Sequence, residues 1–177
     1  LADIGSVYRE RVQYLANNNR MVIDKLPYNI FNVGEIAAGM PDAKIIIMRR
    51  DAGDVGLSCF ATPFQKGLGF ANDLSDIGFM IGLTETLSRH WRNVLPDRVT
   101  EFSYERLIEE SEKQIRSLLD FCGLEWDENV LKFNEHRRRV GTASFVQVSK
   151  PLYRTSVAKW RHYVGHLAPL MNALNKC

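Results

Sequence analysis

Three polar side chains follow three predicted short β-strands, at the points where these strands would end. The pairs of strand and side chain are Met21–Ile23 with Lys25, Ile45–Met48 with Arg50, and Arg98–Phe102 with Tyr104. If the strands are parallel neighbours, the three side chains project over the same edge of the sheet, where open α/β sheets bind ligands. Two cations and a phenol suit an anionic ligand. The spacing therefore predicts an anion-binding site at this edge.

The stretch Lys44–Phe60 predicts the element that carries most of this site. Its uninterrupted apolar run, Ile45–Met48, is typical of a strand that is buried on both faces of a parallel sheet. Asp51 stands where a helix N-cap would stand, and Ser58 lies about two turns into the predicted helix. The stretch thus indicates strand, turn and helix, with Arg50 at the carboxyl end of the strand. The alternative is a purely structural βα unit whose arginines are solvated.

The composition is that of a globular protein with one sizeable core. The 177 residues are 45% hydrophobic and 25% charged, with a net charge of +2, and they predict a single domain over residues 1–177. No apolar run approaches the roughly 20 residues of a membrane span, and no signal peptide begins at Leu1. Three cysteines without C-x-x-C spacing predict reduced thiols. We therefore expect a cytoplasmic protein whose partners include neither a membrane nor a nucleic acid.

Apolar residues at helical spacing predict helices between and after the strands. The predicted helices are Leu1–Asn18, a segment from Asn29 to about Gly39, the helix after Asp51, Asp76–Val94, the segment that begins at Ser111, Asp127–His136 and Leu167–Leu174. Ser111 with Gln114 resembles a capping box, and Gly123 suits the position just after a helix. At least three strands that alternate with helices predict the α/β class, with a parallel sheet flanked by helices.

Four segments, in order along the chain, resemble the sulfotransferase family. RRDAGDVGLSCF, with Arg50 and Ser58 eight positions apart, looks like the segment that binds the 3′-phosphate of the family's nucleotide. DKLP at Asp24–Pro27 is similar to the segment whose basic residue contacts the transferring sulfonate. SYERL at Ser103–Leu107 resembles the segment whose Tyr contacts the nucleotide, and Thr142–Tyr163 looks like the C-terminal nucleotide-binding stretch. The resemblance is nearest to bacterial tetratricopeptide-linked and tyrosylprotein sulfotransferases.

The resemblance implies a P-loop NTPase-like sulfotransferase fold. It also implies transfer of a sulfonate from 3′-phosphoadenosine 5′-phosphosulfate (PAPS) to a hydroxyl or amine of a small molecule or peptide, protein tyrosine included. The product nucleotide would be adenosine 3′,5′-bisphosphate (PAP), and no metal is needed. The implied catalytic residues are Lys25 and Ser144, and the implied nucleotide-binding residues are Arg50, Ser58, Tyr104, Arg154 and Lys159. Each has a plainer alternative: a solvated cation, a turn-capping serine or a packed tyrosine.

One landmark of the family has no counterpart in this sequence. In the family, a glycine-rich loop between the first strand and the first helix cradles the 5′-phosphosulfate with backbone N–H groups. Gly5-Ser6 is too little sequence for such a loop. We therefore expect a domain that is truncated at its N-terminus, and three explanations stay open: a C-terminal fragment, omitted segments, or a loop that the protein has lost. The catalytic base, a Glu near that loop in the tyrosylprotein enzymes, is not identified.

Two other functions stay open beside a sulfotransferase. One is an inactive nucleotide-binding relic that keeps only the 3′-phosphate half of the site. The other is a P-loop kinase, which is disfavoured because the Arg50–Ser58 segment and the C-terminal stretch would have no role in it. His162 and His166 are four residues apart, as in a helical metal pair, but no third ligand accompanies them in the sequence. We therefore expect no metal.

Overall fold

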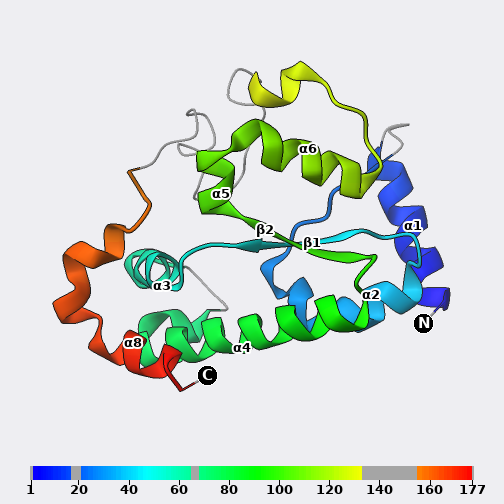
Figure 1. Cartoon of the computed structure of the whole chain (residues 1–177). Helices are drawn as coiled ribbons and strands as arrows, with labels where there is room; N and C mark the ends of the chain where they lie inside the picture. The colour runs from blue at the N-terminus through cyan, green and yellow to red at the C-terminus, as the bar shows by residue number, and fades with distance from the viewer. Residues whose placement is uncertain (1, 17–20, 65–67, 133–154, 177) are drawn as a thin grey trace. The chain divides into compact units, whose positions relative to one another are not determined.

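Two short strands pair in a small parallel sheet that is flanked by helices (Figure 1). They are β1 (Ile45–Arg49) and β2 (Val99–Ser103), and their pairing begins where the Ile45 amide donates to the Arg98 carbonyl at 2.8 Å. The structure is a computed structural model that describes residues 2–16, 21–64, 68–132 and 155–176. The predicted α/β class with a parallel sheet is confirmed.

Helices make up most of the regular structure in the described residues. The α-helices are α1 (Ala2–Ala16), α2 (Val33–Gly39), α3 (Ala52–Ala61), α4 (Leu74–Val94), α5 (Tyr104–Glu109), α6 (Ser111–Cys122) and α8 (Ala168–Leu174). The 3₁₀ helices are η1 (Pro27–Asn32), η2 (Gly69–Asn72), η3 (Glu128–Lys132) and η4 (Lys159–His166). Most helices predicted from apolar spacing are therefore present, with shifts of a few residues at their ends.

The chain divides into two compact units. The first comprises Leu1–Ile47 with Thr84–Thr100, and the second comprises Met48–Leu83 with Glu101–Cys177. The chain passes from one unit to the other within β1, within α4 and within β2. Whether residues 1–177 act as one domain stays a prediction.

In the first unit, α1 and α2 contact each other through two glycines. A Cβ atom on Gly5 would lie 1.8 Å from the carbonyl oxygen of Gly39, so only glycine allows this approach. Arg9, on α1, donates from Nη2 to the same Gly39 oxygen at 3.1 Å. Gly5 therefore allows the close contact between α1 and α2.

Arg98 ties the end of α2 to the start of β1 in the same unit. Its Nη1 donates to the Ala37 carbonyl at 3.0 Å, and its Nη2 donates to the Met40 carbonyl at 2.7 Å. Nε and Nη2 also approach the Ala43 carbonyl at 3.4 Å. The last carbonyls of a helix have no partner within the helix, so this guanidinium supplies the donors that α2 lacks.

The core of the second unit joins α4 to the C-terminal part of the chain. Ile77, Leu167 and Leu170 are almost fully buried, and partly buried side chains from α3 and η2 surround them. Gly78 faces α8, because a Cβ atom there would lie 2.6 Å from the Ala173 Cβ and 2.8 Å from the Leu170 carbonyl oxygen. Helix α8 thus packs directly on the backbone of α4.

Two predictions about strands are wrong. Met21–Ile23 is not a strand: these residues have no regular structure, and Ile23 is 89% exposed. A strand is stable only when a neighbour pairs with its backbone, and no described segment pairs with this one. Strand β1 is also not buried on both faces, since burial alternates along it and Met48 is 59% exposed. Two strands rather than three or more are therefore present in the described residues.

Helix ends agree with prediction where a local signal is strong. Gly123 follows α6 in the left-handed conformation, with φ of 68°, as predicted for a residue just after a helix. The capping box at Ser111 is wrong, because the Ser111 hydroxyl donates back to the Leu107 carbonyl at 2.7 Å. The helix predicted from Asn29 begins two residues earlier, as the 3₁₀ turn η1 at Pro27. Of the helix predicted at Asp127–His136, the described residues form η3, and the remainder lies outside them.

Candidate functional site

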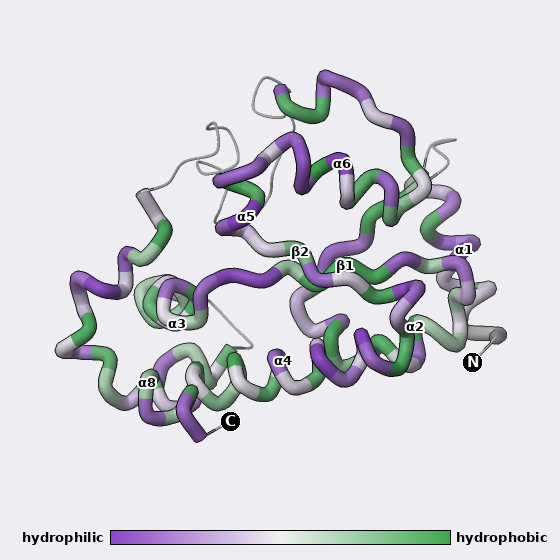
Figure 2. The backbone as a smooth tube through the Cα atoms, in the orientation of Figure 1, coloured by the Kyte–Doolittle hydropathy of each residue, from purple (hydrophilic) through white to green (hydrophobic). Residues whose placement is uncertain are grey.

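Arg50 stands between β1 and α3, in a turn that local hydrogen bonds fix. Asp51 caps α3 as predicted, because its carboxylate accepts from the Asp54 amide at 3.0 Å. The Asp51 amide donates to Glu105 on α5 at 2.9 Å, which ties the start of α3 to the segment after β2. Figure 2 shows the backbone changing from hydrophobic to strongly hydrophilic where β1 leads into α3. The sequence thus places a fixed cation at the carboxyl end of β1.

The guanidinium of Arg50 lies over the ring of Tyr104, 5.0 Å from the ring centre. Its Nη2 donates to the Ser156 carbonyl at 2.6 Å, and the hydroxyls of Tyr104 and Ser156 are 3.3 Å apart. Residues from the ends of β1 and β2 and from the C-terminal segment therefore meet at one place. The prediction that Arg50 and Tyr104 lie together is confirmed by this stacking.

Arg50 keeps part of its hydrogen-bonding capacity unused. Its Nε is buried and has no hydrogen-bond partner among the described residues. Its Nη2 lies 3.9 Å from the buried carboxylate of Asp54, and the side chain as a whole is 28% exposed. A guanidinium has five N–H donors, so donors remain for an anion that reaches its exposed edge.

Ser58 lies two turns along α3 and is exposed. Its carbonyl accepts from the Thr62 hydroxyl at 2.7 Å, whereas its own hydroxyl makes no hydrogen bond to Arg50 in the described part of the chain. The neighbouring residue Cys59 is a free thiol whose pKa is raised by burial. Ser58 is thus available to a ligand on the solvent side of α3, and its role stays a prediction.

Lys25 is exposed and lies in the irregular segment before η1. It belongs to the first unit, whereas Arg50 and Tyr104 belong to the second, so its convergence with them stays a prediction. The Tyr8 hydroxyl on α1 donates to the neighbouring Asp24 carboxylate at 2.5 Å. This hydrogen bond, with burial and the Asp24 charge, raises the pKa of Tyr8 to about 12. The DKLP segment is therefore held to α1.

Lys159 is exposed at the start of η4, between two residues whose backbone is fixed. The amides of Ala158 and Trp160 donate to the two oxygens of Asp54 at 2.7 and 3.1 Å. Neither Asp54 nor Ser156 is among the site residues predicted from the sequence. An acidic residue within the small, apolar stretch of α3 is the signal that could have identified Asp54. Ser144, Arg154 and the basic run Arg137–Arg139 lie outside the described residues.

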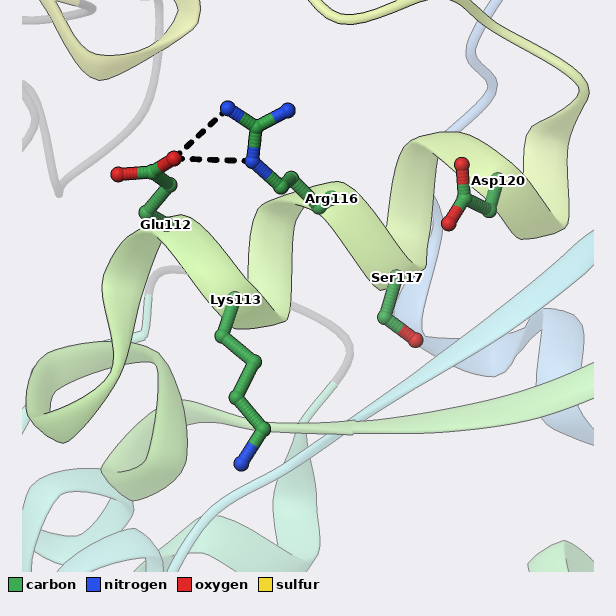
Figure 3. A pocket seen from close by; sticks show the side chains of 5 residues that line it. All are labelled: Glu112, Lys113, Arg116, Ser117 and Asp120. Carbon is green, nitrogen blue, oxygen red and sulfur yellow. Dashed lines mark hydrogen bonds and ion pairs between the residues drawn. The ribbon is translucent and has the colours of Figure 1, made fainter.

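A shallow hollow of about 500 Å³ on α6 is a separate feature (Figure 3). Its lining side chains all come from that helix: Glu112, Lys113, Arg116, Ser117 and Asp120. Arg116 pairs with Glu112 at 2.7 Å and stacks on Trp126, 3.8 Å from the ring centre. None of the predicted site residues lines this hollow, so the hollow is not part of the candidate site at Arg50 and Tyr104.

The described residues show neither a metal-binding cluster nor a helix that could span a membrane. No group of three or more His, Cys, Asp and Glu side chains gathers there in a way that could hold a metal ion. His162 and His166 are exposed on η4. None of the described helices combines the length and the apolar character needed to cross a membrane.

Comparison with known proteins identifies the family of the chain. The sequence profile of the sulfotransferase family matches residues 1–128, which include Lys25, Arg50, Ser58 and Tyr104. The chain is also 38% identical, over 179 residues, to an uncharacterized protein of Aquifex aeolicus (strain VF5). That alignment covers 99% of this chain and 24% of the relative, so the chain spans about a quarter of the relative's length. On the family match, the chain belongs to the sulfotransferase family.

Proposed function

We propose that the chain carries the nucleotide-binding site of a PAPS-dependent sulfotransferase. The observation that carries this proposal is the cluster at the strand ends, where the guanidinium of Arg50 stacks on Tyr104 while its side chain stays partly exposed. Membership of the sulfotransferase family supplies the reaction class. A bidentate cation beside an aromatic ring suits the phosphate and the base of a nucleotide.

In this proposal the residues contact two parts of the donor, the 3′-phosphate and the nucleoside. Arg50 and the Ser58 hydroxyl bind the 3′-phosphate, Tyr104 contacts the nucleoside, and the exposed Lys159 adds a second cation. Because a 3′-phosphate distinguishes this nucleotide from AMP, the Arg50 side chain sets the preference for the bisphosphate. Ser144 and Arg154 keep the sulfonate-binding and phosphate-binding roles that the family resemblance implies.

The transfer breaks the bond between the sulfonate sulfur and the bridging oxygen of the 5′-phosphate, and forms a bond from sulfur to the acceptor oxygen or nitrogen. The acceptor gives up one proton to a base, and PAP leaves with the negative charge. Lys25 is assigned to the bridging oxygen, where a cation stabilises the transition state more than the ground state. The acceptor is a hydroxyl or amine of a small molecule or peptide, with protein tyrosine among the candidates.

The test compares nucleotide affinities by calorimetry, using PAP and AMP. We expect wild-type protein to prefer PAP, and Arg50→Ala to lower PAP affinity ten- to a hundred-fold, or about 1.5–3 kcal/mol. Arg49→Ala is the matched control, since Arg49 is the neighbouring arginine and lies 3.8 Å from Glu101 instead. Equal affinity for PAP and AMP in the wild-type protein would exclude the proposed function. If the native protein prefers PAP but transfers no sulfonate, the result would favour the alternative of an inactive nucleotide-binding protein.

A further inference from the structure

The carboxylate of Asp54 holds backbone from a distant part of the chain. Its side chain is almost completely buried, and its two oxygens accept from the amides of Ala158 and Trp160 at 2.7 and 3.1 Å. A buried carboxylate is tolerated only when hydrogen bonds or charges replace its water. Asp54 therefore fixes the backbone on both sides of Lys159 against α3.

The backbone conformation at Ala158 and Lys159 is one that binds anions through its N–H groups. Ala158 has φ of 57° and ψ of 20°, the left-handed region that residues with a Cβ atom seldom adopt. Lys159 follows it as the first residue of a right-handed turn. Alternating hand in successive residues turns neighbouring N–H groups toward one side and makes a concave anion site. In this structure the anion is the carboxylate of Asp54.

Two further contacts fix the same segment beside Arg50. The Ser156 carbonyl accepts a hydrogen bond from Arg50. The ring of Trp160 packs directly against the backbone of α3 at Gly53. A Cβ atom on Gly53 would lie 2.6 Å from two atoms of that ring. The segment from Ser156 to Trp160 is thus held by contacts from the end of β1 and from α3 (Figure 1).

We propose that Asp54 is a positioning residue for the 3′-phosphate of the nucleotide. It fixes the backbone around Lys159 and the carbonyl partner of Arg50, and so sets two cations for one phosphate. This inference rests on the proposed function for its ligand, but the docking of the segment can be measured without any ligand. Asp54 itself touches neither the phosphate nor the reacting sulfonate.

Positioning and charge predict opposite changes in PAP affinity when the Asp54 carboxylate is removed. The carboxylate lies 3.9 Å from Arg50, so by charge it weakens the attraction of that site for a phosphate. If charge were its only contribution, neutralising Asp54 would tighten the binding of PAP. If Asp54 positions the segment, the same change weakens it. The sign of the change therefore separates the two explanations.

The primary variant is Asp54→Asn, studied in the native protein at its full length. The amide keeps the shape of the carboxylate but turns an NH₂ group toward an N–H donor, so one of the two bonds is lost. We expect PAP affinity to fall about ten-fold or more, with AMP affinity nearly unchanged, and faster hydrogen exchange at the Ala158 and Trp160 amides. A general loss of structure would lower both affinities and would not change their ratio.

Asp51→Asn is the matched control. It removes the same charge from the same helix, retains a good N-cap residue, and does not touch Ala158 or Trp160. We expect PAP to bind this variant at least as tightly as the wild-type protein, with unchanged exchange in the segment.

Gly53→Ala provides an independent variant if Asp54→Asn does not fold. Alanine favours the helical backbone of α3, but its Cβ atom displaces the ring of Trp160 while Asp54 stays in place. We expect the same loss of preference for PAP over AMP. In the active protein, either variant should raise the KM for the donor more than it lowers kcat, because only binding of the 3′-phosphate is affected.

Two results separate failure of this inference from failure of the proposed function. Unchanged or tighter PAP binding in Asp54→Asn, with Arg50→Ala still losing the preference for PAP, would overturn the positioning role and leave the proposed function intact. If the wild-type protein binds PAP and AMP equally, the proposed function fails and this inference fails with it.

Discussion

The guanidinium of Arg50 has three kinds of neighbour: an aromatic ring, a backbone carbonyl and a buried carboxylate. These contacts fix the plane of the group, and a fixed plane allows bidentate binding of a phosphate. A lysine could not make the same contacts at once, because its ammonium is a single point charge on a flexible stem. The arginine is therefore suited to this position by geometry as well as by charge.

Tyr8 gives a prediction about pH at the scale of one residue. Its pKa is raised to about 12, first by the hydrogen bond to Asp24, then by burial and by the Asp24 charge. A pKa raised in the folded state means that folding favours the protonated phenol. The stabilisation is therefore complete below about pH 10 and is lost as pH rises from about 10 to 12.

The measurement is the ultraviolet absorbance of ionised tyrosine, followed from pH 8 to 13 in wild-type protein and in Tyr8→Phe. We expect the difference between the two titrations to have its midpoint near the raised pKa of Tyr8. Asp24→Asn should move that midpoint toward the ordinary value of a tyrosine. An identical titration in Asp24→Asn would show that the hydrogen bond to Asp24 does not hold the phenol in solution.

At the scale of elements, the contact of α8 with α4 depends on a missing side chain. Gly78→Ala places a Cβ atom against the Ala173 Cβ and the Leu170 carbonyl, neither of which can turn aside. We expect the free energy of unfolding to fall by about 1–3 kcal/mol, although alanine is the better helix former. Chemical denaturation of the two proteins measures this difference.

Gly69→Ala is the control for Gly78→Ala. Gly69 also belongs to the second unit, and a Cβ atom there meets nothing within 4 Å. We expect its free energy of unfolding to stay within about 0.5 kcal/mol of the wild-type value. Equal effects of the two substitutions would mean that the contact between α8 and α4 adds no measurable stability.

The elements that the sequence predicted well are those with a local cause. Asp51 caps α3 by accepting a hydrogen bond from the amide of Asp54, three residues further along the chain. Gly123 follows α6 because a residue in the left-handed conformation is needed there. Met21–Ile23 was mistaken for a strand because strand formation depends on a partner that periodicity cannot identify. The alternating burial of β1 has the same origin, since the number of strands beside it decides which faces are covered.

The site could be predicted in part for a comparable reason. Strand ends are visible in the sequence, and they place Arg50 beside Tyr104 correctly. The partners of Asp54 are more than a hundred residues away and are backbone amides, which carry no mark in the sequence. A contact made by backbone is therefore the part of this site that sequence reasoning misses.

At the scale of the whole molecule, Lys25 and Arg50 belong to different units. Their action on one donor therefore stays a prediction. In an active native protein we expect Lys25→Ala to lower kcat about a hundred-fold or more, with much less effect on PAP affinity. Lys25→Arg should rescue only part of the loss, because a planar fork replaces a compact ammonium poorly.

Lys159→Ala is the contrasting variant for Lys25→Ala. Lys159 is assigned to the phosphate, so its removal should raise the KM for the donor and weaken PAP while kcat changes little. Steady-state kinetics, with PAP affinity measured in parallel, separates the two lysines. If Lys25→Ala keeps its kcat and loses PAP affinity, Lys25 binds a phosphate and the transition-state role assigned to it is wrong.

The position of the second unit's core along the chain has a consequence for synthesis in the cell. Ile77 is covered by Leu167 and Leu170, so its burial waits until some ninety further residues have left the ribosome. Until then α4 exposes an apolar face, and such a nascent chain is a natural client for chaperones that bind exposed hydrophobic segments. Arg98 and its three carbonyl partners, by contrast, are all translated by residue 98, so the end of α2 can be secured much earlier.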